Sequence, residues 1–100
     1  MSRRKWTLRR HLAFLKAHFP MSKPVRVQVG KTARKIDGTI SETDKAFYIV
    51  INARVSLMRQ KETLWHEYAH AMAGWSDKHQ HTDKWGICYA AIYRKIQEEI

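Results

Sequence analysis

The segment His66-Glu67-Tyr68-Ala69-His70 brings together residue types that bind metals and transfer protons. In a helix, two histidines four residues apart lie one turn apart on nearly the same face, so both imidazoles can bind one metal ion. The glutamate between them then projects beside the metal, where its carboxylate can accept a proton from a water that the metal binds. The spacing therefore predicts a hydrolytic metal centre, with His66 and His70 as ligands and Glu67 as the base.

A polar turn on the surface of a helix would be the simpler interpretation of this motif. Apolar residues surround it, however, and predict a helix that is mostly enclosed: Leu64, Trp65, Ala69 and Met72. Unpaired polar side chains are costly in such surroundings, and a bound metal removes that cost. We therefore favour the metal site.

A catalytic zinc site needs a third protein ligand and one position left open for water. The longer motif of metzincins would require glycine at position 73 and histidine at position 76. This chain has Ala73 and Ser76 instead, which excludes that class. The third ligand must lie further along the chain.

His81 is the preferred third ligand, because a short return of the chain after Gly74 would bring it back beside the start of the last predicted helix. His79, two residues earlier, is an alternative. A carboxylate, from Asp77 or Asp83, is the remaining option. Asp83 is better explained as negative charge at a helix N-terminus.

The rest of the chain must form the elements that position this motif. Apolar residues recur at helical spacing over residues 7–19 and stop at Pro20, which predicts a first helix. Residues 24–29 alternate apolar and polar side chains, which predicts a half-buried strand. Two turn-like segments, Asp37-Gly38 and residues 42–45, are each followed by a further short strand, at 39–41 and 47–52. We expect a small sheet of about three strands.

Helical spacing returns at Leu57 and continues to about Ala73, so the motif falls inside a helix, and Gly74 can end that helix. Thr82 is a predicted N-cap of a final helix, whose buried face would carry Trp85, Cys88, Tyr89, Ile92 and Ile96. The expected fold class is α+β, with an N-terminal helix, a small three-stranded sheet, the active-site helix and a C-terminal helix.

The composition is that of one globular domain. The 100 residues are 44% hydrophobic and 28% charged, and two full domains are excluded by this length. The single cysteine, Cys88, indicates a reducing compartment rather than a disulfide-stapled secreted fold. The longest apolar run, Ala46 to Ile51, is far too short to span a membrane. We expect a cytoplasmic protein without membrane association.

Basic residues concentrate in the N-terminal third. Residues 1–36 carry eleven lysines and arginines and no acidic residue, in a chain of net charge +10. With Trp6 among them, these charges could hold the phosphates of DNA without reading its sequence. A solvated basic face that aids solubility explains the pattern equally well.

The motif His66-Glu67-Tyr68-Ala69-His70 resembles that of the SprT-like zinc metallopeptidases, which include small stand-alone versions in bacteriophages. The resemblance covers about residues 46–100 and rests also on His81-Thr82-Asp83-Lys84-Trp85-Gly86 and on Tyr89-Ala90-Ala91-Ile92-Tyr93-Arg94. In that family the third histidine is typically followed by glycine and, four positions on, by an aromatic residue. Trp85 matches the aromatic position and thereby selects His81, whereas Thr82 departs from the glycine. The zinc ribbon of some members has no counterpart here, because the chain has one cysteine.

The resemblance implies a minimal zincin core in a single domain, residues 1–100. One Zn²⁺ per chain would be held by three histidines, His66, His70 and His81. Glu67 would act as general base and then general acid in the hydrolysis of peptide bonds, in a protein or peptide substrate that could be associated with DNA. The alternative is a non-catalytic DNA-binding or host-interaction protein in which zinc only stabilises the fold.

Further expectations concern the surroundings of the site. Residues 47–52 directly precede the active-site helix and are a candidate sheet edge for an extended peptide, although a plain buried strand is equally consistent. Tyr89 or Tyr93 could offer a hydroxyl to an oxyanion, but Tyr89 fits the core better. Cys88 is expected to be a small buried hydrophobe, and Trp85 to line the core or the cleft.

Overall fold

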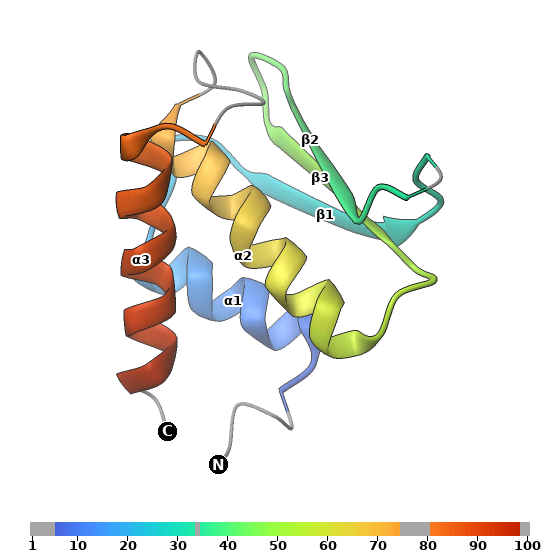
Figure 1. The fold of residues 1–100 in the computed structure, drawn as a ribbon. Helices are drawn as coiled ribbons and strands as arrows, with labels where there is room; N and C mark the ends of the chain where they lie inside the picture. Colours follow the sequence, from blue (N-terminus) through green and yellow to red (C-terminus); the bar gives the residue numbers. More distant parts are fainter. Residues whose placement is uncertain (1–5, 34, 75–80, 99–100) are drawn as a thin grey trace.

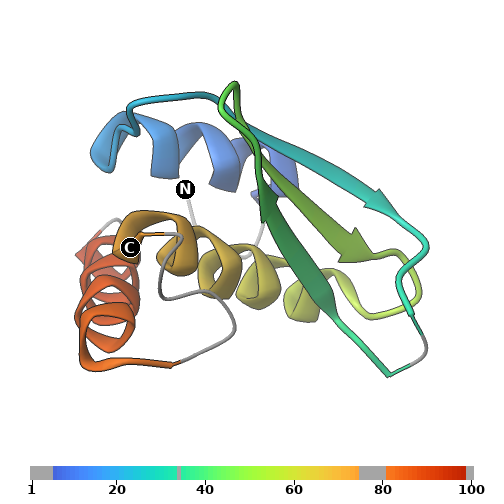
Figure 2. The same cartoon turned by 90° about the horizontal axis from the view of Figure 1, so that it is seen from above.

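The computed structural model describes residues 6–33, 35–74 and 81–98. Their secondary structure confirms the predicted α+β class and the predicted order of elements (Figure 1). The elements are α1 (Leu8–His18), β1 (Val25–Gly30), β2 (Gly38–Glu42), β3 (Phe47–Asn52), α2 (Leu57–Ala73) and α3 (Asp83–Glu98). Figure 2 shows the three helices on one side of the sheet, with α2 between α1 and α3.

Helix α1 begins and ends close to where its sequence pattern predicts. The Thr7 hydroxyl accepts a hydrogen bond from the backbone N–H of Arg10 (3.1 Å), which caps the first turn. Leu15 is fully buried on the inner face. At the far end, the Tyr68 hydroxyl of α2 donates to the carbonyl of Phe19 (2.7 Å), so the end of α1 is tied to the middle of α2.

The sheet has the strand order β1-β3-β2, with β1 parallel to β3 and β2 antiparallel to it. The prediction that Phe47–Asn52 is an edge strand is therefore wrong, because β3 pairs on both of its sides. Its side chains alternate, with Phe47, Ile49 and Ile51 buried against the helices and Tyr48 exposed. In the described part of the chain, β2 and β1 are the two edge strands of the sheet, one on each side of β3.

Helix α2 is the centre of the core. The Ser56 hydroxyl caps its first turn by accepting from the N–H of Arg59 (3.2 Å), and Gly74, at φ 104°, ends it in a conformation that favours glycine. Leu64 and Tyr68 are fully buried under the sheet and α1, and Ile92 of α3 packs into the same cluster. The segment His66–His70 is thus carried on the most enclosed of the described helices. None of the helices in the described ranges has the length and apolar character needed to cross a membrane.

Candidate metal centre

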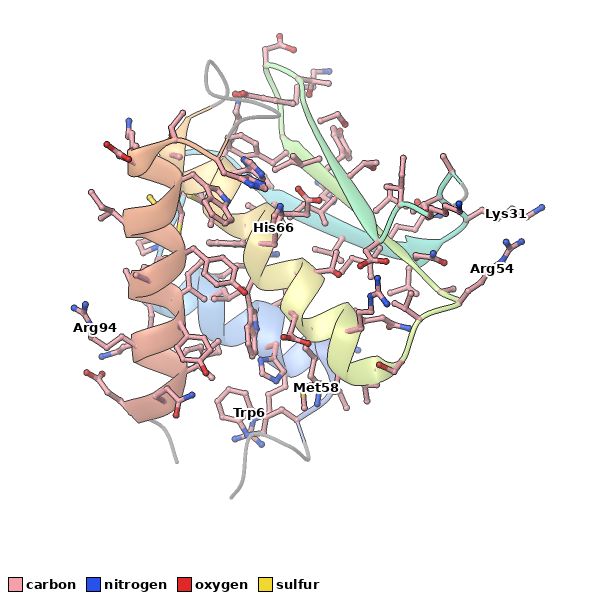
Figure 3. All side chains as sticks on the ribbon, viewed as in Figure 1. Trp6, Lys31, Arg54, Met58, His66 and Arg94 are labelled. Carbon is pink, nitrogen blue, oxygen red and sulfur yellow. The ribbon has the colours of Figure 1, made fainter. Side chains whose placement is uncertain are left out.

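Three histidines meet at one place, although they come from two parts of the chain. His66 and His70 lie on α2, and His81 lies just before α3. Each of them offers a ring nitrogen, and these nitrogens all lie within 4.8 Å of one another. The ring centroids of His66 lie 5.0 Å from His70 and 4.7 Å from His81. Figure 3 shows His66 on α2, between α3 and the sheet.

The separation of one pair of these nitrogens fits a metal with tetrahedral geometry. Two imidazole nitrogens bound to one zinc ion at 2.0–2.1 Å should lie about 3.3 Å apart. The Nε2 atoms of His66 and His81 are 3.1 Å apart, close to that separation. Three neutral imidazoles with one open position form the donor set of catalytic zinc sites. The residues present therefore fit a zinc ion.

Electrostatics also favours the form of His66 that binds metals. Burial lowers the pKa of the His66 imidazole from its ordinary value, and the neighbouring His81 lowers it further. A lower pKa keeps the ring neutral with a free lone pair, which is the state that coordinates a metal.

The other predicted ligands have different places. Asp83 lies in the first turn of α3, where it complements the helix dipole as predicted, and it is not part of the histidine cluster. His79 and Asp77, like the excluded position Ser76, lie outside the described residues.

The Glu67 side chain lies beside the histidines and is almost completely buried, with 7% of its surface exposed. Burial raises the pKa of its carboxyl to about 7. His66 and Glu67 both line a cavity of about 460 Å³, together with Gly38, Thr63 and Tyr89. A carboxyl group that titrates near neutrality and reaches a cavity is suited to take up and release protons.

Strand β2 lines a second cavity, of about 350 Å³, and all three histidines and Glu67 line the same cavity. The backbone N–H of Asn52 donates to the carbonyl of Asp37, and that of Thr43 donates to the carbonyl of Ala46. These bonds place residues 37 and 43 at hydrogen-bonded positions of the antiparallel pair with β3. Since such positions alternate, Gly38, Ile40 and Glu42 direct their backbone N–H and C=O groups to the outer side of β2.

Gly38 is a site residue that the sequence analysis missed. A Cβ atom at this position would lie 2.5 Å from Cγ2 of Thr63 and 3.4 Å from Oε2 of Glu67. The strand can approach α2 at Glu67 only because residue 38 has no side chain. The pair Asp37-Gly38 was interpreted as a turn, and a glycine followed by a short strand was the available signal for a close backbone approach.

The aromatic residues of α3 differ in their relation to the site. Trp85 contacts the histidines directly, with its ring centroid 4.2 Å from that of His81. Tyr89 lines the larger cavity and lies 6.4 Å from the His66 ring, whereas Tyr93 is half-exposed and contacts Trp65 instead. Of the two tyrosines, Tyr89 is the one that borders the site.

Two other predicted residues lie away from the histidines. Cys88 is partly buried beside the core, and burial raises the pKa of its thiol while Lys84 opposes that shift. Trp6 is 6% exposed, packs against Phe14 and lies under the Arg10 guanidinium (4.8 Å). The Trp6 ring is therefore part of the packed interior, whereas the basic side chains near it in the sequence, Arg9 and Arg10, are exposed.

Comparison with protein-family models, with curated proteins and with solved structures gave no match for this chain. A functional assignment must therefore be argued from the geometry and chemistry of the site.

Proposed function

We propose that this protein is a zinc-dependent metalloendopeptidase of the SprT-like type, with His66, His70 and His81 as zinc ligands. The observation that carries the proposal is the convergence of three imidazoles on one point beside a buried carboxyl group. The Nε2 atoms of His66 and His81 are 3.1 Å apart, and Glu67 lines the same cavity.

When bound, the zinc ion would supply Lewis-acid chemistry, polarising the peptide carbonyl and lowering the pKa of a water to roughly 7. Glu67 takes a proton from this attacking water as its oxygen bonds to the carbonyl carbon. Glu67 then gives the proton to the peptide nitrogen as the C–N bond breaks, which leaves a free amine and a carboxylic acid; the acid loses its remaining proton to solvent near neutral pH and becomes a carboxylate. A pKa of about 7 lets one carboxyl group perform both steps near neutral pH.

A peptide is the substrate class that the surroundings favour. The outer side of β2 offers the N–H and C=O groups of Gly38 and Ile40 to an extended chain, which can add to the sheet as a further strand. Gly38 borders Glu67, so a peptide held on this edge passes directly over the histidine cluster. The substrate edge is then β2 rather than β3.

A metal position left open for water would distinguish an enzyme from a zinc-stabilised binding protein. A closed structural site would need a fourth protein ligand, and the cluster found in the described residues has three. We therefore retain the catalytic proposal over the non-catalytic alternative.

We also propose non-specific recruitment to DNA through the basic N-terminal third, with DNA-associated proteins as substrates. Arg9, Arg10 and Lys16 are exposed along α1, and Arg26 and Lys31 are exposed at β1 and just after it. Such charges favour phosphate contacts without base readout. The single cysteine favours a reducing compartment, and we propose the cytoplasm.

The decisive test compares wild type with Glu67→Gln, which keeps the size of the side chain but cannot accept the proton. We expect one zinc per chain in both proteins by elemental analysis, and cleavage of an unfolded protein substrate by wild type alone. Glu98→Gln, at the far end of α3, is the matched control and should cleave normally. Undiminished cleavage by Glu67→Gln would refute the mechanism.

A further inference from the structure

The indole of Trp85 is in contact with all three histidines of the cluster. It stacks on the His81 ring at 4.2 Å between centroids and 24° between planes. It also lies 5.0 Å from the ring of His66 and 5.6 Å from that of His70. One side chain therefore forms a wall against the whole candidate metal centre.

Of the three proposed ligands, His81 is held least by secondary structure. His66 and His70 are fixed on α2, whereas His81 lies outside the helices and is exposed. An exposed side chain that samples several rotamers must lose that freedom before it can bind a metal. Whatever restrains the His81 ring in advance therefore strengthens metal binding.

The start of α3 provides this restraint. The Thr82 hydroxyl accepts a hydrogen bond from the backbone N–H of Trp85 (3.2 Å), and the Thr82 carbonyl accepts from the N–H of Gly86 (3.0 Å). These bonds begin the helix immediately after His81, and Trp85 follows four residues later. The N-terminal turn thus brings the indole over the imidazole.

A second contact fixes this turn to α2. The indole N–H of Trp85 donates to the backbone carbonyl of His66 (3.2 Å). The hydrogen bond joins α3 to α2 at one of the proposed ligands. The separation between His81 and His66 is therefore restrained by a direct bond between α2 and the helix that begins just after His81.

We infer that Trp85 and Thr82 are positioning residues that hold His81 in the third ligand position. This inference rests on the proposed binding of a metal by the three histidines. Trp85 acts through His81 and His66, and Thr82 acts by fixing the turn. The capping hydroxyl also gives a physical reason for threonine directly after the third histidine, where the SprT-like pattern has glycine.

Metal affinity is the measurement that tests the inference, with Co²⁺ as a spectroscopic probe and a zinc chelator as competitor. Supporting groups around metal ligands typically change affinity by about 10- to 100-fold. We expect a loss of that size in Trp85→Leu, and a smaller loss in Trp85→Phe, which keeps a stacking ring but lacks the N–H. Thr82→Ala should weaken binding, and Thr82→Ser, which keeps the hydroxyl, should restore it.

Tyr93→Leu is the matched control, because it removes a half-exposed aromatic ring from the same helix at a distance from the histidines. It should bind Co²⁺ as wild type does. The thermal stability of each variant, measured in excess chelator, separates positioning from a general structural role. A purely structural Trp85 would lower this metal-free stability and leave the affinity of the folded protein unchanged.

The outcomes distinguish the inference from the proposed function. Wild type that binds Co²⁺, with equal affinity in Trp85→Phe, Trp85→Leu and Thr82→Ala, overturns the inference alone. Wild type that binds neither Co²⁺ nor Zn²⁺ overturns both. Should Trp85→Leu fail to fold, Trp85→Phe and the two Thr82 variants decide the matter, because each of them is a smaller change than the loss of the aromatic ring.

Discussion

Substitution of Gly38 by alanine tests whether the close approach of β2 to α2 shapes the site. The added methyl carbon would lie 2.5 Å from Cγ2 of Thr63, 3.1 Å from the carbonyl oxygen of Val50 and 3.4 Å from Oε2 of Glu67. Carbon atoms normally pack about 3.5–4.0 Å apart, so the strand and the helix must separate by about 1 Å. Overpacking of this kind typically costs about 1–3 kcal/mol.

The neighbour at Thr63 allows the cause to be isolated. Thr63→Ser removes Cγ2 but keeps the hydroxyl that donates to the carbonyl of Arg59 (2.8 Å). This change alone should cost about 0.8 kcal/mol for one buried methylene-sized group. In the double variant with Gly38→Ala, the 2.5 Å contact with Cγ2 of Thr63 is absent. The double variant should therefore lose less stability than the sum of the losses in the two single variants. We expect a favourable coupling of about 1 kcal/mol, with a residual cost from the Val50 carbonyl.

Urea unfolding in excess chelator measures these free energies without a contribution from metal binding. Peptide cleavage, measured in parallel with zinc, should fall in Gly38→Ala and recover in part in the double variant, because the outward shift of β2 moves the substrate edge from Glu67. Gly86→Ala is the matched control. Its Cβ would meet nothing within 4 Å, and alanine in a helix should stabilise by about 0.8–1.0 kcal/mol. Full stability of Gly38→Ala, or strictly additive losses, would refute the reasoning.

Three more outcomes are expected. Zinc at about 100 times its dissociation constant should raise the free energy of unfolding by about 2.7 kcal/mol. Calorimetry should show that a chelator removes this stabilisation and that zinc does not stabilise His70→Ala. Because burial raises the pKa of the Cys88 thiol, the thiolate is scarcer at a given pH in the folded protein, so iodoacetamide should react more slowly than with the unfolded chain and accelerate only at alkaline pH. Lys84→Gln removes the charge that opposes this shift and should slow the reaction further, which mass spectrometry can follow. If the folded protein reacted faster at pH 7 than the chain unfolded in urea, the raised pKa of Cys88 would be contradicted. Binding to duplex DNA should weaken steeply with salt and fall again when Arg9 and Arg10 are changed to glutamate, and affinity that does not vary with salt in a fluorescence-anisotropy titration would exclude the recruitment proposal.

The helices of the fold could be predicted from the sequence because their signals are local. Apolar spacing, the caps at Thr7 and Ser56 and the positive φ of Gly74 act within one or two turns of chain, and the observed bounds of α1 and α2 lie close to the predicted ones. The strands at 24–29 and 47–52 were found for the same reason, from the alternation of their side chains.

The strand order could not be predicted in this way. An apolar alternation shows that a strand has a buried face, but it does not show which strands lie beside it. The β1–β3 pairing joins segments that are separated by β2 along the chain, so the central place of β3 is a product of the whole fold. The candidate sheet edge was consequently placed on β3, which is the central strand of the sheet.

The candidate site also contains residues that local sequence could predict and residues that it could not. His66, Glu67 and His70 share one helical turn, and their geometry follows from the spacing alone. The meeting of His81 with His66 depends on how α3 returns to α2, and the motif resemblance favoured it before the structure placed the two rings together. Gly38 carried a weaker signal, because its role depends on Val50, Thr63 and Glu67, which lie further along the sequence.

Helix α2 supplies both the centre of the packed interior and most of the candidate metal centre, which restricts how this protein can be altered. Leu64 and Tyr68 have no exposed surface, and Glu67 and His70 stand beside them on the same turns. Under the proposed peptidase function, mutant libraries aimed at new substrate preferences should therefore leave α2 constant. Diversity belongs in the outward-facing side chains of β2, where replacements would change what touches a peptide on the proposed edge at little risk to folding.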